Sequence, residues 1–468
     1  MTAILASALG FIDGSVVAIA LPAMRADLGA TLSQAQWISN AYLLTLSALI
    51  LVGGAFGDRF GLARVFGGGI ALFVVASVFC AAAPNAQSLI IARLVQGVGA
   101  AFMVPGSLAL IARAYPDGER GAAIGTWAAA SAVTTAAGPI IGGLLLTFGT
   151  DSIWRWIFAV NLPLGALALW LLIRHVDRDP NTATAGLDLP GAALATLGLG
   201  ALAWALTGAE HGQSASLGLA TFGIAALALF LWVEAHSPCP MLPLGLFADR
   251  AFSAANAITF TIYFALSTLL FYLPMTVIST WGVTAIEAAA AFAPLSVFIG
   301  LFSARIGRLE PRFGAGPLIA TGCGLLAIAY VAIAITAPAM QFWTRTFPGC
   351  VVLGAGMALI VTPLSTTIMA SVPAASTGTA SGVNNAVSRL AGLIAVAAMG
   401  SLAAVVYGAY GGALSFGAAD PDAAHAIATT RAFTLLCGVA AVLAGLSCIG
   451  ALIYLPRAAT QPQSMGGR

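Results

Sequence analysis

Long apolar stretches dominate the chain and limit what it can fold into. Of its 468 residues 60% are hydrophobic and only 7% are charged, whereas a soluble domain carries about a quarter charged residues. A helix that crosses a bilayer needs about 20 consecutive apolar residues. Fourteen such segments occur, near residues 3–23, 37–57, 64–83, 88–112, 121–147, 155–173, 188–207, 216–234, 251–274, 284–304, 315–336, 344–369, 381–408 and 431–455. We therefore expect an all-α integral membrane protein with fourteen transmembrane helices.

The distribution of basic residues predicts the orientation of these helices. An even number of spans places both termini on one side of the membrane. All 18 basic residues are arginines, and twelve of them fall in loops or the tail on the side of the termini, against four in the opposite loops. Because cytoplasmic loops are enriched in basic residues, we expect both termini in the cytoplasm and the protein in the cell (inner or plasma) membrane.

Two halves of the sequence echo each other. The segment GGAFGDRFGLAR at 53–64 has a fainter counterpart, SARIGRLEPRFG, at 303–314, and a shift of 257 positions aligns Gly97 with Gly354 and Gly99 with Gly356. Internal repeats are typical of secondary transporters, whose substrate site lies between the repeated halves near the bilayer midplane. We predict a six-helix bundle at 1–175, a linker with two inserted helices at 176–240, a second six-helix bundle at 241–458 and a short cytoplasmic tail at 459–468.

Asp13 is an acidic residue deep inside the first apolar segment. It lies about twelve residues into that span, about 18 Å along a helix that rises 1.5 Å per residue. A charge at mid-membrane costs about 2.5–3.5 kcal/mol and normally marks a functional site. Asp13 is therefore a candidate to bind a proton or a cationic substrate. The alternative is a carboxylate held permanently by neighbouring hydroxyls or by Arg93.

Arg93 is the second charge inside an apolar segment, and Cys350 occupies the equivalent position of the repeat. We hypothesise that Arg93 faces the central cavity and modulates protonation of the acidic site, because a cation favours a nearby carboxylate. The alternative is that the long side chain reaches out to the nearby membrane interface.

The segment GAFGDRFG reads as a loop between two spans. Its glycines, Gly54 and Gly61 among them, permit a tight turn and close helix contact, and Asp58 is placed to accept hydrogen bonds from a helix N-terminus or from Arg120. Such contacts would break and reform as two halves rock, so the segment is a candidate gate. An ordinary solvated loop is the alternative.

The fifth span carries AAGPIIGG, with Gly138, Pro139, Gly142 and Gly143. Proline removes a helix hydrogen bond and bends the helix, and small residues allow another helix to approach. The pattern indicates either a hinge or close packing alone. Beyond it, Trp154, Arg155 and Trp156 indicate an aromatic anchor at the opposite membrane interface.

The motifs together resemble the major facilitator superfamily, in particular its fourteen-transmembrane drug:proton antiporter branch. IDGSVVAIALP at 12–22 is similar to the first-span signature with its acidic residue, GDRFG to the gate motif, RLVQGVGAA at 93–101 to the proton-coupling motif, GPIIGG at 138–143 to the antiporter motif and WRWIFAVNLPLG at 154–165 to a segment of fourteen-spanners. The resemblance implies proton-driven multidrug export by alternating access. It implies Asp13 and Arg93 as coupling residues, and Asp58, Arg59 and Arg64 at the cytoplasmic gate.

The leading hypothesis is antiport of amphipathic drugs or toxic compounds; the alternative is a dedicated exporter or proton symporter of one small metabolite. Aromatic faces attract cations, so the ninth span, with Phe260, Tyr263, Phe264, Phe271 and Tyr272, is a candidate for the cavity wall, although such residues also pack in cores or face lipid. Possible substrate-cavity residues are Gln96, Tyr263, Phe264, Asn384 and Asn385. Helix packing explains the two asparagines equally well.

Other function classes find little support. No metal cluster, nucleophile and base pair or phosphate loop occurs in the connections, so we expect neither an enzyme nor a cofactor. The six cysteines and four histidines have no ligand spacing, and we interpret the histidines as solvated loop residues. A net charge of +2 without a clustered basic face argues against nucleic-acid binding. The expected partners are a lipophilic small molecule, protons and the lipid bilayer, with the protein functioning as a monomer.

Overall fold

The computed structural model describes residues 1–149, 152–176, 188–207, 213–373, 376–420 and 422–456, and among these residues every regular element is helical. Thirteen stretches are long and apolar enough to cross a membrane. The helix α5 (Asp117–Phe148) is the remaining long helix, and its apolar part, Val133–Phe148, is shorter. The expectation of an all-α membrane protein is confirmed.

The helices follow one another in long antiparallel runs. The first seven are α1 (Thr2–Asp27), α2 (Leu32–Phe60), α3 (Leu62–Ala81), α4 (Ala86–Ala114), α5, α6 (Arg155–Ala159) and α7 (Asn161–His175). The next two are α8 (Leu189–Thr207) and α9 (Gln213–His236). The last seven are α10 (Arg250–Thr280), α11 (Ala285–Ala290), α12 (Ala293–Phe313), α13 (Ala315–Thr336), α14 (Phe347–Ala370), α15 (Thr377–Ala409) and α16 (Ala423–Tyr454), with short 3-10 or π turns at Leu244–Ala248, Ala337–Ala339 and Phe342–Thr346.

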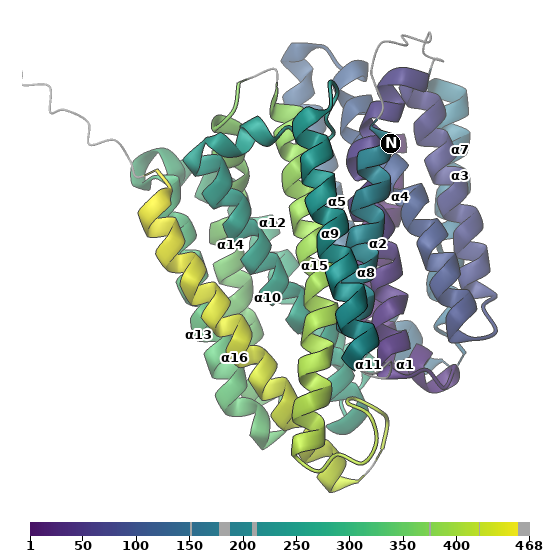
Figure 1. Cartoon of the computed structure of the whole chain (residues 1–468), viewed down its shortest axis with the longest axis vertical. Helices are drawn as coiled ribbons and strands as arrows, with labels where there is room; N and C mark the ends of the chain where they lie inside the picture. Colours follow the sequence, from purple (N-terminus) through teal and green to yellow (C-terminus); the bar gives the residue numbers. More distant parts are fainter. Residues whose placement is uncertain (150–151, 177–187, 208–212, 374–375, 421, 457–468) are drawn as a thin grey trace, which may run out of the picture.

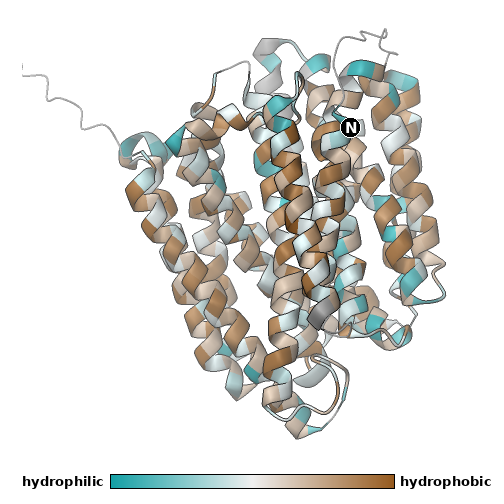
Figure 2. Ribbon diagram, in the orientation of Figure 1, coloured by the Kyte–Doolittle hydropathy of each residue, from teal (hydrophilic) through white to brown (hydrophobic). Residues whose placement is uncertain are grey.

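Figure 1 shows the early helices gathered on one side of the molecule and the late, green and yellow helices on the other, with α8 and α9 in front. The N-terminus lies at the upper end, here called the Met1 end, and the loop between α15 and α16 lies at the opposite end. Hydrophobic residues run along the helices, and hydrophilic ones gather at the two ends (Figure 2). The division at 175, 240 and 458 stays a prediction. Residues 177–187 of the predicted linker and the tail at 459–468 lie outside the described residues.

The repeat seen in the sequence reappears in the helix packing. Gly61 ends α2 with φ of 95° and Gly314 ends α12 with φ of 81°, a backbone region that favours glycine. A Cβ on Gly99 of α4 would lie 2.9 Å from the carbonyl oxygen of Gly69 on α3, and one on Gly356 of α14 would lie 2.8 Å from that of Gly322 on α13. Both helix pairs thus meet through facing glycines, which let the backbones approach closely.

We expect Gly99→Val to destabilise the fold. The added Cβ would lie 2.6 Å from the backbone nitrogen of Phe73, so α3 and α4 must separate, at a cost of about 1–3 kcal/mol. The measurement is the midpoint of unfolding in denaturing detergent. Gly68→Val is the matched control, because no atom lies within 4 Å of its Cβ position. Equal midpoints for the two variants would contradict the glycine contact.

The helix α8 packs against α2 and α15. Trp37 Nε1 on α2 donates to Thr207 Oγ1 at 2.9 Å, and the hydroxyl of Ser401 on α15 donates to the carbonyl oxygen of Leu206. Leu44, Leu199, Ala203, Leu393 and Ala397 form one buried cluster across the three helices. Through α8, the inserted pair therefore contacts an early and a late helix.

Two predictions about residues in or near the loops between spans are wrong. Trp154 does not anchor the protein at the interface, because its ring is fully buried and its Nε1 donates to Asp27 Oδ2 at 2.9 Å; Trp156, 62% exposed, does fit that role. His425 is not a solvated loop residue, since it is buried in the first turn of α16 and its Nδ1 lies 2.6 Å from Tyr407 Oη. His211 lies outside the described residues.

Candidate functional site

Asp13 and Arg93 form a buried ion pair between α1 and α4. Arg93 Nη1 lies 2.5 Å from Asp13 Oδ2, and the two side chains are 2% and 0% exposed. Arg93 therefore does not extend to the membrane interface. In this structure it holds the Asp13 carboxylate, which was the alternative considered for Asp13. The counterpart Cys350 is also buried, so the charge belongs to one half only.

A polar network, here called the Asp13 cluster, surrounds the ion pair and consists of Asp13, Arg93, Gln96, Ser77 and Asn161. Gln96 Nε2 donates to Asp13 Oδ1 at 3.0 Å and to Ser77 Oγ at 2.9 Å, while Gln96 Oε1 accepts from Arg93 Nη1 at 2.6 Å. Asn161 Nδ2 on α7 donates to Ser77 Oγ on α3 at 3.2 Å. Four helices thus converge on one carboxylate.

Backbone and aromatic contacts fix Arg93 from the α2 side. Its Nε donates to the carbonyl oxygen of Ile38 at 3.1 Å, and its guanidinium carbon lies 4.3 Å from the ring centroid of Tyr42. Arginine stays charged in proteins, whereas a carboxylate can take up a proton. Within the cluster, Asp13 is the group that can change its charge, and protonation would remove the charge that holds Arg93.

The structure brings one predicted residue, Gln96, into the Asp13 cluster and adds two further residues. Gln96, predicted as a substrate-cavity residue, is fully buried beside the carboxylate. Ser77 and Asn161 were missed by the sequence analysis. Asn161 offered a signal, since it is an amide inside an apolar segment, where a polar group needs a partner; Ser77 offered none, because serine is common in membrane helices.

The predicted hinge glycines lie where α5 meets its neighbours. A Cβ on Gly138 would meet Ile12 and Ser15 of α1, one on Gly142 would meet Val16, and one on Gly143 would lie 2.8 Å from Cα of Ile286 on α11. Pro139 lies inside α5. Close packing thus accounts for the three glycines, with Gly138 beside the helix turn that carries Asp13. Hinge motion stays a prediction.

The predicted gate segment is mostly helical. The residues GAFGDRF form the last turns of α2, and only Gly61 lies outside the helix, so the interpretation as a loop is wrong. Gly54 has open space at its Cβ position, and the Arg59 guanidinium lies 5.5 Å from the ring of Phe60. Arg64 is exposed at the start of α3. The side chains of Asp58 and Arg120 lie outside the described residues, so their contact stays a prediction.

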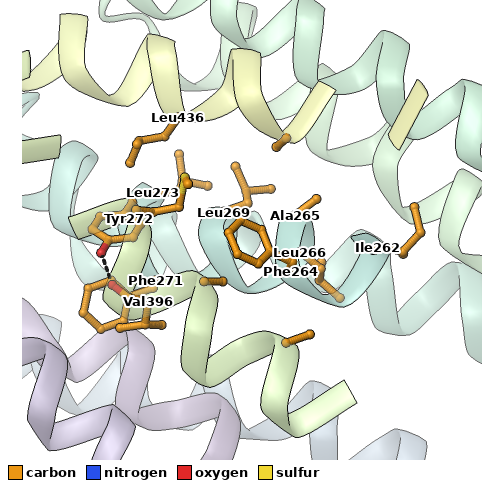
Figure 3. Close-up of a cluster of buried hydrophobic side chains, with 14 of the residues drawn as sticks. Ile262, Phe264, Ala265, Leu266, Leu269, Phe271, Tyr272, Leu273, Val396 and Leu436 are labelled. Atoms are coloured by element: carbon orange, nitrogen blue, oxygen red, sulfur yellow. Dashed lines mark hydrogen bonds between the residues drawn. The ribbon is translucent and has the colours of Figure 1, made fainter. Parts of the chain in front are cut away.

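The aromatic residues of α10 divide into two groups. Phe264, Phe271 and Tyr272 belong to the main buried core (Figure 3), whereas Phe260 and Tyr263 are half-buried beside it. Tyr272 Oη donates to the carbonyl oxygen of Val396 at 2.6 Å. Packing therefore explains the first group.

The two asparagines of α15 have different surroundings. Asn384 Nδ2 donates to Thr259 Oγ1 at 2.7 Å and to Asn256 Oδ1 at 3.2 Å, both on α10. Asn385 is exposed, and its Nδ2 donates to the carbonyl oxygen of Ser381 at 3.0 Å. Asn384 links two helices, which fits the packing interpretation, and a role for either residue in substrate binding stays a prediction.

Contacts between the early and late helices hold together the end opposite Met1, here called the closed end. Arg25 Nη1 on α1 donates to the carbonyl oxygen of Phe416 at 2.5 Å, in the loop between α15 and α16. Gln36 Nε2 on α2 donates to Tyr272 Oη at 3.1 Å. The backbone nitrogen of Ile286 on α11 donates to Thr147 Oγ1 on α5 at 3.0 Å.

Comparisons with known proteins agree with this architecture. The family model of the Major Facilitator Superfamily matches residues 3–396. Multidrug resistance protein Stp of Mycobacterium tuberculosis strain CDC 1551 is 32% identical over 84% of this chain and 73% of its own length. The methylenomycin A resistance protein of Bacillus subtilis is 34% identical over 84% and 85%, and puromycin resistance protein pur8 of Streptomyces alboniger is 34% identical over 86% and 81%.

Solved structures show the same fold. A bacterial homolog of the human lysosomal transporter Spinster, in an inward-facing and unoccupied conformation, matches 97% of this chain and 96% of its own with a TM-score of 0.69 and 17% identity. A D-xylose-proton symporter matches 98% and 97% with a TM-score of 0.67 and 16% identity. With the family model and the curated relatives, these matches show that the chain belongs to the Major Facilitator Superfamily and is a multi-pass secondary transporter, not an enzyme.

Proposed function

We propose that the protein exports amphipathic drugs or toxic compounds in exchange for protons. The buried pair of Asp13 and Arg93 carries this proposal, because a carboxylate so deep in a membrane helix is costly unless it has a function. The relatives named for multidrug, methylenomycin A and puromycin resistance support drugs as the substrate class. We infer from the arginine distribution that both termini are cytoplasmic.

The cluster supports a coupling mechanism centred on α1. In the ionised state, both oxygens of Asp13 accept hydrogen bonds, one from Arg93 and one from Gln96. A proton on Asp13 removes the charge attraction to Arg93, so the tie between α1 and α4 weakens. Because α1 also packs on α5 beside Gly138 and Gly142, a shift of α1 would be passed on to α5, which reaches α11 at the closed end.

Alternating access then requires the closed end to open. With cytoplasmic termini, the closed end faces the outside, so we assign this structure to a state sealed on the outer side by Arg25, Gln36 and Thr147. The gate residues Gly54, Asp58, Arg59, Gly61, Arg64 and Arg120 would act at the opposite, Met1 end. Taking up a proton at Asp13 from outside would follow the opening of that seal.

The test is proton release from energised everted vesicles when lipophilic cations, neutral drugs or small metabolites are added. We expect flux with several drugs in the wild type and none in Asp13→Asn. Asp27→Asn is the matched control, because Asp27 also lies on α1 and pairs with an arginine, Arg155, at 3.2 Å, but is partly exposed. Flux with one metabolite only would favour a dedicated carrier. Unchanged flux in Asp13→Asn would refute coupling through this residue.

A further inference from the structure

A groove between α10 and α16 opens at the Met1 end of the molecule. It encloses about 490 Å³, and its lining includes Ser253 and Ala257 of α10 together with Ser447 and Gly450 of α16. These side chains are small and leave a groove on this face of the packed helix pair. Leu446, a further lining residue, is 58% exposed, and the nearby Ile449 and Ile453 are 55% and 64% exposed. In a membrane helix such an exposed apolar face contacts lipid.

The groove is polar at one end and apolar along its length. Arg250, the first residue of α10, and Tyr454, the last residue of α16, line its mouth. Arg250 is exposed and has no ion pair among the described residues; the neighbouring Asp249 instead accepts from the backbone nitrogen of Phe252 at 2.8 Å. The guanidinium is therefore available for an anion at the membrane surface.

The depth of the groove matches one leaflet. Thr261, the lining residue farthest along α10, lies eleven residues beyond Arg250, about 16 Å at 1.5 Å per residue. One half of a hydrocarbon core that is about 30 Å thick has nearly the same depth. Thr261 Oγ1 lies 2.6 Å from Ser447 Oγ, so at this depth the two helices are bonded across the groove and close it.

We propose that this groove is a binding site for one anionic phospholipid of the leaflet at the Met1 end. Its phosphate binds Arg250 and the hydroxyl of Tyr454, and an acyl chain lies along Ala257 and Gly450 as far as Thr261. Charge complementarity selects the anionic headgroup, because basic residues at the ends of membrane helices attract anionic lipids. The site is separate from the Asp13 cluster and does not depend on proton coupling.

Native mass spectrometry of the delipidated full chain tests the proposal, with phosphatidylglycerol and phosphatidylcholine of identical acyl chains added in turn. We expect one tightly bound lipid and about five-fold tighter binding of phosphatidylglycerol, the ratio that corresponds to about 1 kcal/mol for one arginine. Arg250→Ala should remove the preference but keep the lipid. Ala257→Trp should fill the groove and remove both lipids.

The matched controls are Arg308→Ala, an exposed arginine of α12, and Ile449→Trp, a lipid-facing position of α16 outside the lining. Both should bind as the wild type does. Any of three results would overturn the proposal: a wild type that does not prefer phosphatidylglycerol, an Arg250→Ala variant that keeps this preference, or an Ala257→Trp variant that binds lipid as the wild type does. Displacement of the lipid by an equimolar lipophilic cation would also overturn it, because the groove would then hold amphiphiles in general.

Discussion

Arg93→Ala is expected to destabilise the protein more than any other single change at the candidate site. The substitution leaves the Asp13 carboxylate buried without its counter-charge and removes the hydrogen bonds to Ile38 and Gln96. Removing one partner of a buried ion pair costs about 3–5 kcal/mol, a large part of the about 5–15 kcal/mol that stabilises a typical protein. The measurement is the midpoint of unfolding in denaturing detergent.

A second substitution separates charge from packing. Asp13→Asn combined with Arg93→Ala removes both charges, so the double variant should be more stable than Arg93→Ala alone, although it should not transport. Arg155→Ala is the control for a partly exposed pair, for which we expect a loss of about 1 kcal/mol or less. A double variant as unstable as the single one would mean that the lost packing of Arg93, and not the unpaired charge, causes the effect.

The sequence predicted the two charges and offered their pairing as one alternative, but it did not determine that they pair. Asp13 and Arg93 stand out because each lies inside an apolar segment, and the position of each along its helix follows from a rise of 1.5 Å per residue. Their contact depends on how α1 and α4 are rotated and packed, which no local pattern encodes over a separation of 80 residues. The same holds for Gln36 and Tyr272, which are 236 residues apart.

The glycine patterns were informative about packing and misleading about turns. Gly99 of α4 and Gly356 of α14, which the repeat aligns, each face a glycine of the preceding helix. The sequence analysis predicts a loop at GAFGDRFG, but α2 continues to Phe60. Glycine in a membrane helix often serves close helix contact. Gly53, directly before this segment, is such a case, because a Cβ on it would lie within 3 Å of the carbonyl carbon of Ala101 on α4.

Gly143→Val is expected to open the closed end and to slow transport. A Cβ at this position would lie 2.8 Å from Cα of Ile286 and 3.0 Å from the carbonyl oxygen of Ala285. Both are backbone atoms that cannot move aside alone, so α5 and α11 must separate and the bond from Ile286 to Thr147 is lost. A cost of about 1–3 kcal/mol that falls only on the closed state shifts the balance toward the open state by about 5–150-fold.

This change can be measured as the distance between spin labels attached at positions 87 and 420, Gln87 and Asp420 in the wild type. The labelled protein carries serine in place of the exposed Cys239. Both positions lie at the closed end: Gln87 is exposed in the first turn of α4, and Asp420 is half-buried in the loop before α16. We expect longer distances in Gly143→Val than in the wild type, and unchanged distances in Gly445→Val, where no atom lies within 4 Å of the added carbon. The contact between α5 and α11 would have to form in every transport cycle, so we expect Gly143→Val to transport more slowly as well. If Gly143→Val showed both wild-type distances and wild-type transport, α5 and α11 would not form the outer seal.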